Sequence, residues 1–194
     1  MNNNELIASA IMLNLCTLGI PCIYYGTEQA FDGAGNGDFK DRYIREAMFG
    51  GPFGAFRSHD VHFFDEGKDI YKAVSEVAKI RRKQMALRRG RQYLRDISGD
   101  GEHFGPTRKV GGARIQGIIA WSRLFASDEV VCAINTNAEK EIDVYINVDS
   151  EIHPPGTEIG WLYPSSNNVL LVEDRGGRSA VHVRLNAGGF VILK

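Results

Sequence analysis

The stretch that decides the fold is Gly19-Ile20-Pro21-Cys22-Ile23-Tyr24-Tyr25-Gly26-Thr27-Glu28-Gln29. Residues 20–25 form a continuous apolar run, without alternation of polar and apolar side chains. Such a run is typical of a strand that is buried on both faces, as in a parallel sheet covered by helices. We therefore predict a buried strand over residues 20–25, followed at once by a polar segment that includes Thr27 and Glu28.

The segments on either side of this stretch have the pattern of helices. Residues 4–18 are apolar on nearly every side, and a helix of that kind needs cover from other elements. Gly19 and Pro21 end it. Residues 69–87 carry apolar side chains on one face and charged ones on the other. Between the two helices, residues 26–68 form a long loop rich in glycine and aromatic residues, and loops of this length are usually functional.

The character of the sequence changes near residue 90. Short runs rich in valine, isoleucine and aromatic residues alternate with turn residues, which predicts an antiparallel β-sandwich. The predicted strands lie within residues 114–125, 128–136, 141–148, 168–174, 179–185 and 189–194. The fold class is therefore α+β. A helix–strand–loop–helix unit over residues 1–90, which cannot close a core alone, precedes an all-β domain over residues 91–194.

The opening stretch resembles the eighth barrel strand of alpha-amylase family glycoside hydrolases, which reads Gly-x-Pro-x-x-Tyr-Tyr-Gly before an acidic region. Gly19, Pro21, Tyr24–Gly26 and Glu28 match that pattern, whereas Thr27 stands where the family usually has Asp. Later segments are similar in the same order along the chain: Arg45–Met48, Ala86–Gly90, Ile119–Arg123 and Ala133–Thr136. The resemblance implies the end of a (β/α)8 TIM barrel over residues 1–90 and a C-terminal β-sandwich over residues 91–194.

The resemblance also implies a function. The family acts on α-glucosidic bonds by a retaining mechanism, which needs two carboxylates about 5–5.5 Å apart. Those carboxylates follow earlier barrel strands, so we assign no catalytic residue to this chain and expect it to be inactive alone. The expected role is the C-terminal part of a glycoside hydrolase or transglycosidase of carbohydrate metabolism, acting on starch or related oligosaccharides. The alternatives are a non-catalytic carbohydrate-binding module and a purely structural domain.

Four residues are candidates for contact with the α-glucan. Active sites of (β/α)8 barrels lie at the C-terminal ends of the strands, which places Tyr25 and Glu28 beside the glucan cleft. Arg45 would hydrogen-bond sugar hydroxyls, and Trp161, beside Gly160, would stack on a sugar ring. The structural alternatives are core packing for Tyr25 and a local ion pair for Arg45.

No cofactor and no metal are assigned. Asp32, Asn36 and Asp38 have the composition of a calcium loop, which stays an alternative, but their spacing is not diagnostic. The segment from His59 to His62 lacks further ligands at metal-site spacing. The net charge of −1 gives no reason to expect nucleic acid. We interpret the basic run over residues 79–91 as the solvated face of a helix.

The apolar run over residues 6–18 is too short for a membrane span, which needs about 20 residues, and it lacks the basic start of a signal peptide. The three cysteines are odd in number and scattered, which argues against a disulfide framework and favours a reduced, cytoplasmic location. The alternative is a large secreted enzyme that carries free buried thiols. Helix 4–18 and strand 20–25 leave apolar surface without barrel neighbours. We expect that surface to be covered by the rest of a barrel, by self-association or by the sandwich, or to be disordered.

Overall fold

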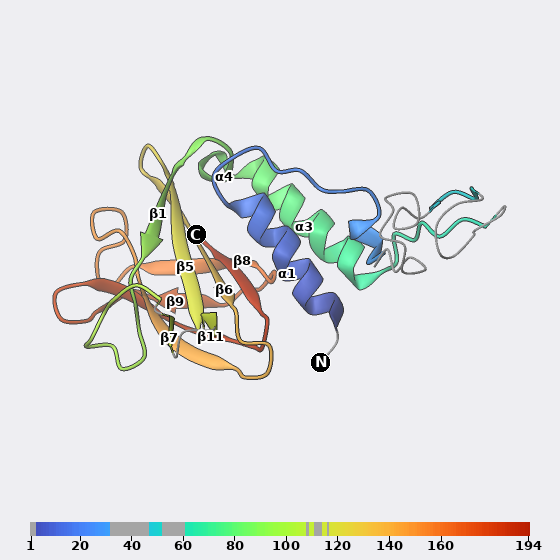
Figure 1. Cartoon of the computed structure of the whole chain (residues 1–194). Helices are drawn as coiled ribbons and strands as arrows, with labels where there is room; N and C mark the ends of the chain where they lie inside the picture. Colours follow the sequence, from blue (N-terminus) through green and yellow to red (C-terminus); the bar gives the residue numbers. More distant parts are fainter. Residues whose placement is uncertain (1–2, 32–46, 52–60, 108, 111–113, 116) are drawn as a thin grey trace.

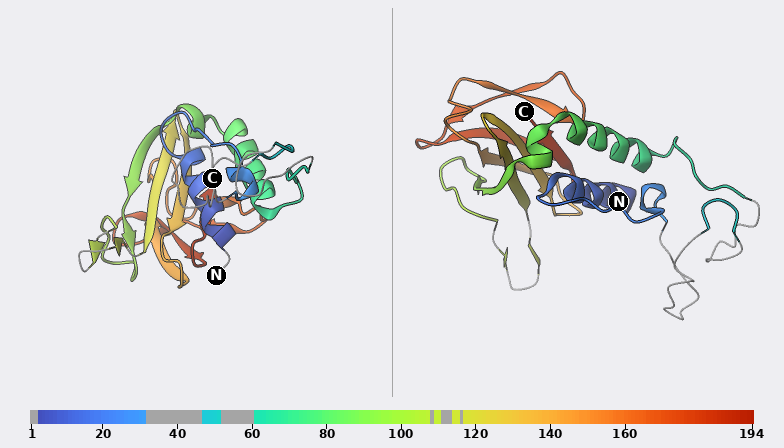
Figure 2. Two further views of the ribbon diagram at one scale, coloured as in Figure 1. Left: turned by 45° about the vertical axis from the view of Figure 1, so that its right-hand side comes forward. Right: turned by 90° about the horizontal axis from the view of Figure 1, so that it is seen from above.

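The computed structural model describes residues 3–31, 47–51, 61–107, 109–110, 114–115 and 117–194. These residues form three layers: helices, a six-stranded sheet beneath them and a four-stranded sheet on the far side (Figure 1). Figure 2 shows from two further directions that the helices lie against one side of the sheets. The helical elements are α1 (Asn3–Cys16), the 3-10 helix η1 (Thr27–Gln29), α3 (Asp69–Lys83) and α4 (Met85–Arg89).

All strand pairs among the described residues are antiparallel, as the sequence predicts for the sandwich. The six-stranded sheet has the order β1-β5-β6-β12-β8-β9, the four-stranded sheet has the order β10-β11-β7-β2, and β3 pairs with β4. The strands are β1 (Arg91–Arg95), β2 (Ile97–Ser98), β3 (Lys109–Val110), β4 (Arg114–Ile115), β5 (Ile118–Phe125), β6 (Asp128–Asn135), β7 (Ile142–Asn147), β8 (Glu158–Tyr163), β9 (Val169–Leu171), β10 (Glu173–Asp174), β11 (Ser179–Leu185) and β12 (Phe190–Leu193).

Neighbouring residues of the central strands enter two different cores, because side chains alternate across a strand. On β5, Trp121 belongs to the core under the helices, whereas Ala120 belongs to the core between the two sheets. On β6, Cys132 and Ala133 divide in the same way. The central strands therefore read as continuous apolar runs although they are antiparallel, since both of their faces are covered.

Helix α1 is covered by α3 and by the six-stranded sheet. Ser9 donates a hydrogen bond to the carbonyl oxygen of Gly188, 2.6 Å away, between β11 and β12. The predicted helix is confirmed, although it ends at Cys16, and contact with the sandwich is one of the expected ways of covering its apolar surface. No helix in the described part of the chain is long and apolar enough to cross a membrane. From residue 6 onward, the buried side chains of α1 are Ala8, Ser9, Ile11, Met12, Leu15 and Cys16.

The prediction of a buried strand over residues 20–25 is wrong. After α1, the chain runs back toward η1 as an irregular segment that pairs with no strand among the described residues (Figure 1). Ile20 is 98% exposed, and Ile23 and Tyr24 are exposed as well. A doubly buried strand needs a strand at each edge and cover on both faces. The described residues supply no such strand, so the apolar run stays open to solvent.

The helix predicted over residues 69–87 forms as α3 and α4, separated by Gln84 in an extended conformation. Gly90 ends the helical part, as the sequence indicates. A Cβ atom at Gly90 would lie 2.4 Å from the carbonyl oxygen of Ala86 and 2.7 Å from that of Leu124. Only glycine therefore fits where the chain passes between α4 and β5.

The basic run over residues 79–91 is a solvated face only in part. Arg82 is exposed, but Arg81 is half-buried and donates to the carbonyl oxygens of Leu15, at 2.6 Å, and Leu87, at 2.5 Å. The interpretation as a solvated face is therefore wrong for Arg81. The last carbonyl groups of a helix lack partners within the helix, and a guanidinium group offers five donors to satisfy them.

Candidate functional site

The polar end of the opening stretch folds into a tight turn around Gly26. Gly26 has a φ of 86°, in the left-handed region that glycine tolerates best, and a Cβ atom there would lie 2.7 Å from the ring of Phe31. The Gly26 carbonyl oxygen accepts hydrogen bonds from the backbone N–H groups of Gln29, at 3.0 Å, and Phe31, at 3.1 Å. This turn holds Tyr25 and Glu28, two of the predicted substrate contacts, within one short loop.

Gln29 connects the turn by hydrogen bonds to the segment that precedes α3. Its side chain is 2% exposed, accepts a hydrogen bond from the N–H of Asp65 at 3.0 Å and donates to the carbonyl oxygen of Asp65 at 3.3 Å. The Lys68 ammonium group donates to the Gln29 carbonyl oxygen at 3.2 Å. Buried polar groups are stable when they are hydrogen-bonded in this way. No sequence pattern marks Gln29 as a positioning residue, because a single glutamine gives no signal.

Tyr25 and Glu28 line a hollow of about 370 Å³ against α3. Tyr25 is 46% exposed, and its hydroxyl oxygen accepts a hydrogen bond from the N–H of Met48 at 2.8 Å. Tyr25 is therefore not the core residue that the structural alternative required. Glu28 is half-buried within η1. The other residues that line the hollow are Ile23, Tyr24, Tyr71, Val74, Ser75 and Ala78.

A cluster of four rings, Phe49, His62, Phe64 and Tyr71, adjoins this hollow. The Phe49 ring centroid lies 5.7 Å from that of His62 and 6.1 Å from that of Phe64, and Phe64 meets Tyr71 edge-on at 5.4 Å. Tyr71 connects the cluster to the hollow because it also lines the hollow. Phe49 is exposed, so the cluster offers apolar ring surface to solvent. No sequence pattern marks Tyr71 as part of a site, since one aromatic residue in an amphipathic helix gives no signal.

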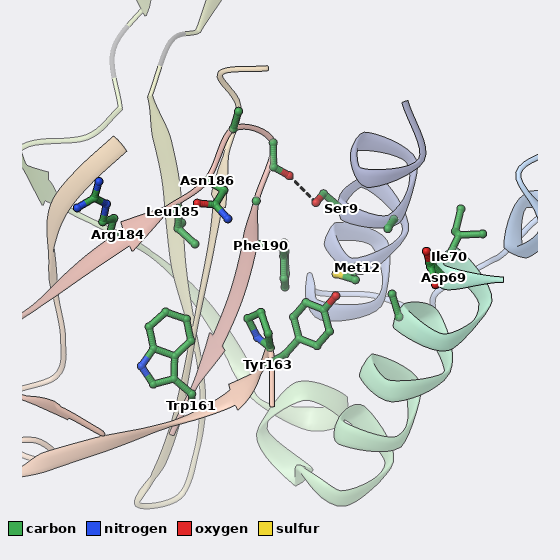
Figure 3. Close-up of a pocket in the computed structure, with 16 residues that line it drawn as sticks. Ser9, Met12, Asp69, Ile70, Trp161, Tyr163, Arg184, Leu185, Asn186 and Phe190 are labelled. Atoms are coloured by element: carbon green, nitrogen blue, oxygen red, sulfur yellow. Dashed lines mark hydrogen bonds between the residues drawn. The ribbon is translucent and has the colours of Figure 1, made fainter. Parts of the chain in front are cut away.

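Trp161 lines a different cavity, of about 380 Å³, between α1, α3 and the sandwich (Figure 3). Trp161 is half-buried, and its indole nitrogen is buried with no hydrogen-bond partner among the described residues. Tyr163 follows on the same strand, and Ser9 and Met12 of α1 lie across the cavity from it (Figure 3). Burial, together with the negative charge of Glu76, raises the pKa of Tyr163.

The four predicted contacts do not meet in one site. Tyr25 and Glu28 share the hollow, Trp161 lies in the separate cavity, and Arg45 lies outside the described residues. The calcium-loop alternative, residues 32–38, and His59 also lie outside them. Within the described ranges, no group of three or more His, Cys, Asp or Glu residues is placed to hold a metal ion.

Comparisons with known proteins give a consistent result. No protein-family profile matches the chain. An alpha-amylase of Niallia circulans is 26% identical over 189 residues, which is 96% of this chain and 28% of that protein. An alpha-amylase of Streptomyces lividans is 30% identical over 187 residues, which is 91% of this chain and 17% of that protein. The chain thus spans less than a third of the length of either curated relative.

Solved structures agree with the fold. The gamma-CGTase of alkalophilic Bacillus clarkii superposes with a TM-score of 0.63 at 18% identity, covering 98% of this chain and 23% of that one. The Geobacillus thermoleovorans alpha-amylase, solved in complex with acarbose, superposes with a TM-score of 0.60 at 17% identity, covering 99% and 33%. Along almost all of its own length, this chain is thus similar to part of the length of two alpha-amylases, and its fold is similar to that of solved alpha-amylase and CGTase structures.

Proposed function

We propose that this chain is part of a glycoside hydrolase or transglycosidase that acts on α-glucosidic bonds. The observation that carries the proposal is the match to two alpha-amylases over 96% and 91% of the chain. The acarbose complex of a structural neighbour supports an oligosaccharide as the ligand. We assign no nucleophile and no catalytic acid to the carboxylates of this chain. In the proposed enzyme, the two catalytic carboxylates would therefore lie outside these 194 residues.

In this proposal, residues 1–90 are the end of a (β/α)8 barrel and residues 91–194 are the sandwich that follows it. The exposed run Ile20–Tyr25 supports the assignment, because an apolar segment without strands beside it is what a barrel strand becomes when its neighbours are absent. Neighbouring barrel strands would satisfy its backbone groups and cover its side chains. A second copy of the chain is the other partner that this surface would accept.

The proposed glucan-binding residues divide between the two hollows. Tyr25 and Glu28 would contact the sugar at the polar end of the strand, with Arg45 as a further contact from the long loop. The exposed ring of Phe49 would stack on the apolar C–H face of a sugar. Trp161 would make a contact of the same kind in its own cavity.

The test is the activity of the protein from the longest reading frame that contains these residues. Release of reducing sugar, which reports hydrolysis, and change in oligosaccharide length, which reports transfer, would be measured on soluble starch, maltooligosaccharides and sucrose. Glu28→Gln and Tyr25→Phe are expected to lower kcat/KM by about tenfold, the effect of losing one hydrogen bond to a charged or polar group. Tyr145→Phe, on β7 of the far sheet, is the matched control and should leave kcat/KM unchanged. Absence of turnover on every substrate would refute the proposal.

A non-catalytic carbohydrate-binding module is the second candidate. One observation favours it: the cavity beside Trp161 and Tyr163 is walled by described residues of both the helical part and the sandwich. Saturable binding of maltooligosaccharides by a longer protein that has no turnover would select this function over the enzymatic one.

A further inference from the structure

We infer that the cavity between α1, α3 and β8 is a binding site for the end of an α-glucan chain, separate from the hollow at Tyr25 and Glu28. The choice of ligand rests on the proposed function, but the site itself rests on the geometry of the cavity. Its volume, about 380 Å³, lies in the range of roughly 300–1,000 Å³ found for small-molecule sites.

The floor and one wall of the cavity are apolar. Met12, Ile70 and Phe190 are buried side chains that line it. Trp161 and Tyr163, both half-buried, add aromatic surface from β8 (Figure 3). A pyranose ring has an apolar C–H face that packs on such surface, whereas a charged metabolite would lose its hydration there without compensation.

The rim of the cavity carries polar side chains. Asp69 of α3 and Asn186, which follows β11, are exposed, and neither side chain is hydrogen-bonded to another described residue. Arg184 also lines the rim and pairs with Glu141. A carboxylate and an amide offer the acceptors and donors that sugar hydroxyl groups require. An apolar floor beneath a few convergent polar groups is the pattern of a ligand site.

The backbone of β8 is irregular where the two aromatic residues lie. Tyr163 pairs with Ile192 and Trp161 pairs with Leu193, so the register shifts between these two pairs. An extra residue on one strand redirects the neighbouring side chains, and such bulges are frequent beside binding sites. Both side chains line the cavity, while Trp161 also packs against the core between the sheets and Tyr163 against the core under the helices.

Tyr145, on β7 of the far sheet, is not available to stack on a sugar ring. The Tyr145 ring is stacked on His182 at 4.6 Å between centroids, and the guanidinium carbon of Arg175 lies 4.4 Å from the same ring centroid. Arg175 also donates to the Tyr145 hydroxyl oxygen at 2.8 Å. Tyr145 is thus engaged by its own neighbours, which leaves Trp161 and Tyr163 as the better-placed aromatic pair in the sandwich.

The site is tested by titrating the 194-residue chain with maltotriose and maltoheptaose and following tryptophan fluorescence. Trp121 is 1% exposed, so a response is expected to come from Trp161 and to disappear in Trp161→Phe. Ala73 lines the cavity from α3, and Ala73→Phe should fill it and weaken binding by at least about tenfold. Ala10→Phe adds the same side chain on the exposed side of α1 and should bind like the unchanged chain.

Asn186→Ala, an exposed position, gives a second test if Ala73→Phe does not fold, and we expect affinity to fall about fivefold. Unchanged affinity in these variants, equal binding of the β-linked cellotriose, or no saturable binding by the unchanged chain would overturn the inference. The assay of starch cleavage by the longer protein is independent of it. If the longer protein cleaves starch but the 194-residue chain does not bind maltooligosaccharides, only this binding site is refuted. If the chain binds them but the longer protein cleaves nothing, only the enzymatic proposal is refuted.

Discussion

Arg123 of β5 donates a hydrogen bond from its guanidinium group to the carbonyl oxygen of Thr17, 2.7 Å away, just beyond the end of α1. The same group donates to the carbonyl oxygens of Cys16, at 3.1 Å, and Gly90, at 2.9 Å. The Trp121 indole nitrogen donates to the Cys16 carbonyl oxygen at 3.2 Å. Arg123 thereby joins the sheet to the free carbonyl groups at the end of α1 and to the chain after α4.

Replacing Arg123 by Met should destabilise the chain by about 3 kcal/mol, because the buried carbonyl groups that it serves would lose their donor. Amide exchange in α1 should also become faster, since the helix loses its attachment to β5. Urea denaturation followed by circular dichroism measures the first effect. Arg91→Met, at an exposed position of β1, is the control and should change stability little. Equal stability of the two variants would contradict this role for Arg123.

Gly90→Ala should cost roughly 2 kcal/mol or more, because its Cβ atom would overlap the carbonyl oxygens of Ala86 and Leu124 and force α4 away from β5. At Gly99 a Cβ atom would meet nothing within 4 Å, so Gly99→Ala serves as the matched control. Thermal unfolding of both variants gives the comparison. A Gly90→Ala chain as stable as Gly99→Ala would mean that the close approach is relieved without cost.

A buried polar cluster surrounds Glu129 inside the sandwich. The Glu129 carboxylate accepts hydrogen bonds from Arg95, from the Ser122 hydroxyl group and, at 3.0 Å, from the N–H of Asp149. His153 lies with its Nε2 atom 3.6 Å from this carboxylate. Burial lowers the pKa of His153, and this effect outweighs the opposite influence of Glu129 and Asp149.

Because the folded state lowers the pKa of His153, the unfolded chain takes up a proton first as the pH falls below about 6.5. The contribution of His153 to stability is therefore complete above that pH and decreases as the pH falls toward the lowered folded pKa. Urea midpoints measured between pH 7.5 and 5 should fall more steeply in the unchanged chain than in His153→Gln. Parallel curves for the two proteins would show that burial does not disfavour the charged ring.

Thiol reactivity should distinguish the three cysteines. Cys22 is exposed, whereas Cys16 and Cys132 are buried, and burial raises the pKa of the Cys132 thiol. Under native conditions one thiol of the 194-residue chain should react quickly with a disulfide reagent, and all three should react after unfolding. In the longer protein, the barrel strands that we propose beside residues 20–25 should slow labelling of Cys22 by about tenfold or more. Equal rates of Cys22 labelling in the two proteins would contradict the proposal that barrel strands lie beside residues 20–25.

The apolar runs at residues 20–25 and in β6 show what a sequence pattern can and cannot predict. Both runs indicate cover on two faces, but the pattern does not say which elements supply it. In β6 the cover comes from helices on one side and a sheet on the other, so the strand forms. For residues 20–25 the described chain holds no neighbouring strand, so the same kind of run stays exposed.

The candidate site could be predicted where its residues are close in sequence. Tyr25 and Glu28 follow the same apolar run, and their shared loop brings them to one hollow. The contacts that hold the site join residues far apart, such as Gln29 with Asp65 across 36 positions, and Arg123 with Thr17 across 106. No local pattern marks such pairs, because each depends on packing that forms only in the folded chain.

The most direct measurement compares two proteins side by side: the 194-residue chain and the product of the longest reading frame that contains it. Release of reducing sugar from soluble starch and maltooligosaccharides is followed at equal molar concentration. Activity in the longer protein and none in the 194-residue chain is the predicted result, because we propose that the chain contributes glucan contacts and not the catalytic carboxylates. Turnover by the 194-residue chain itself would contradict the account and place a catalytic carboxylate pair within it.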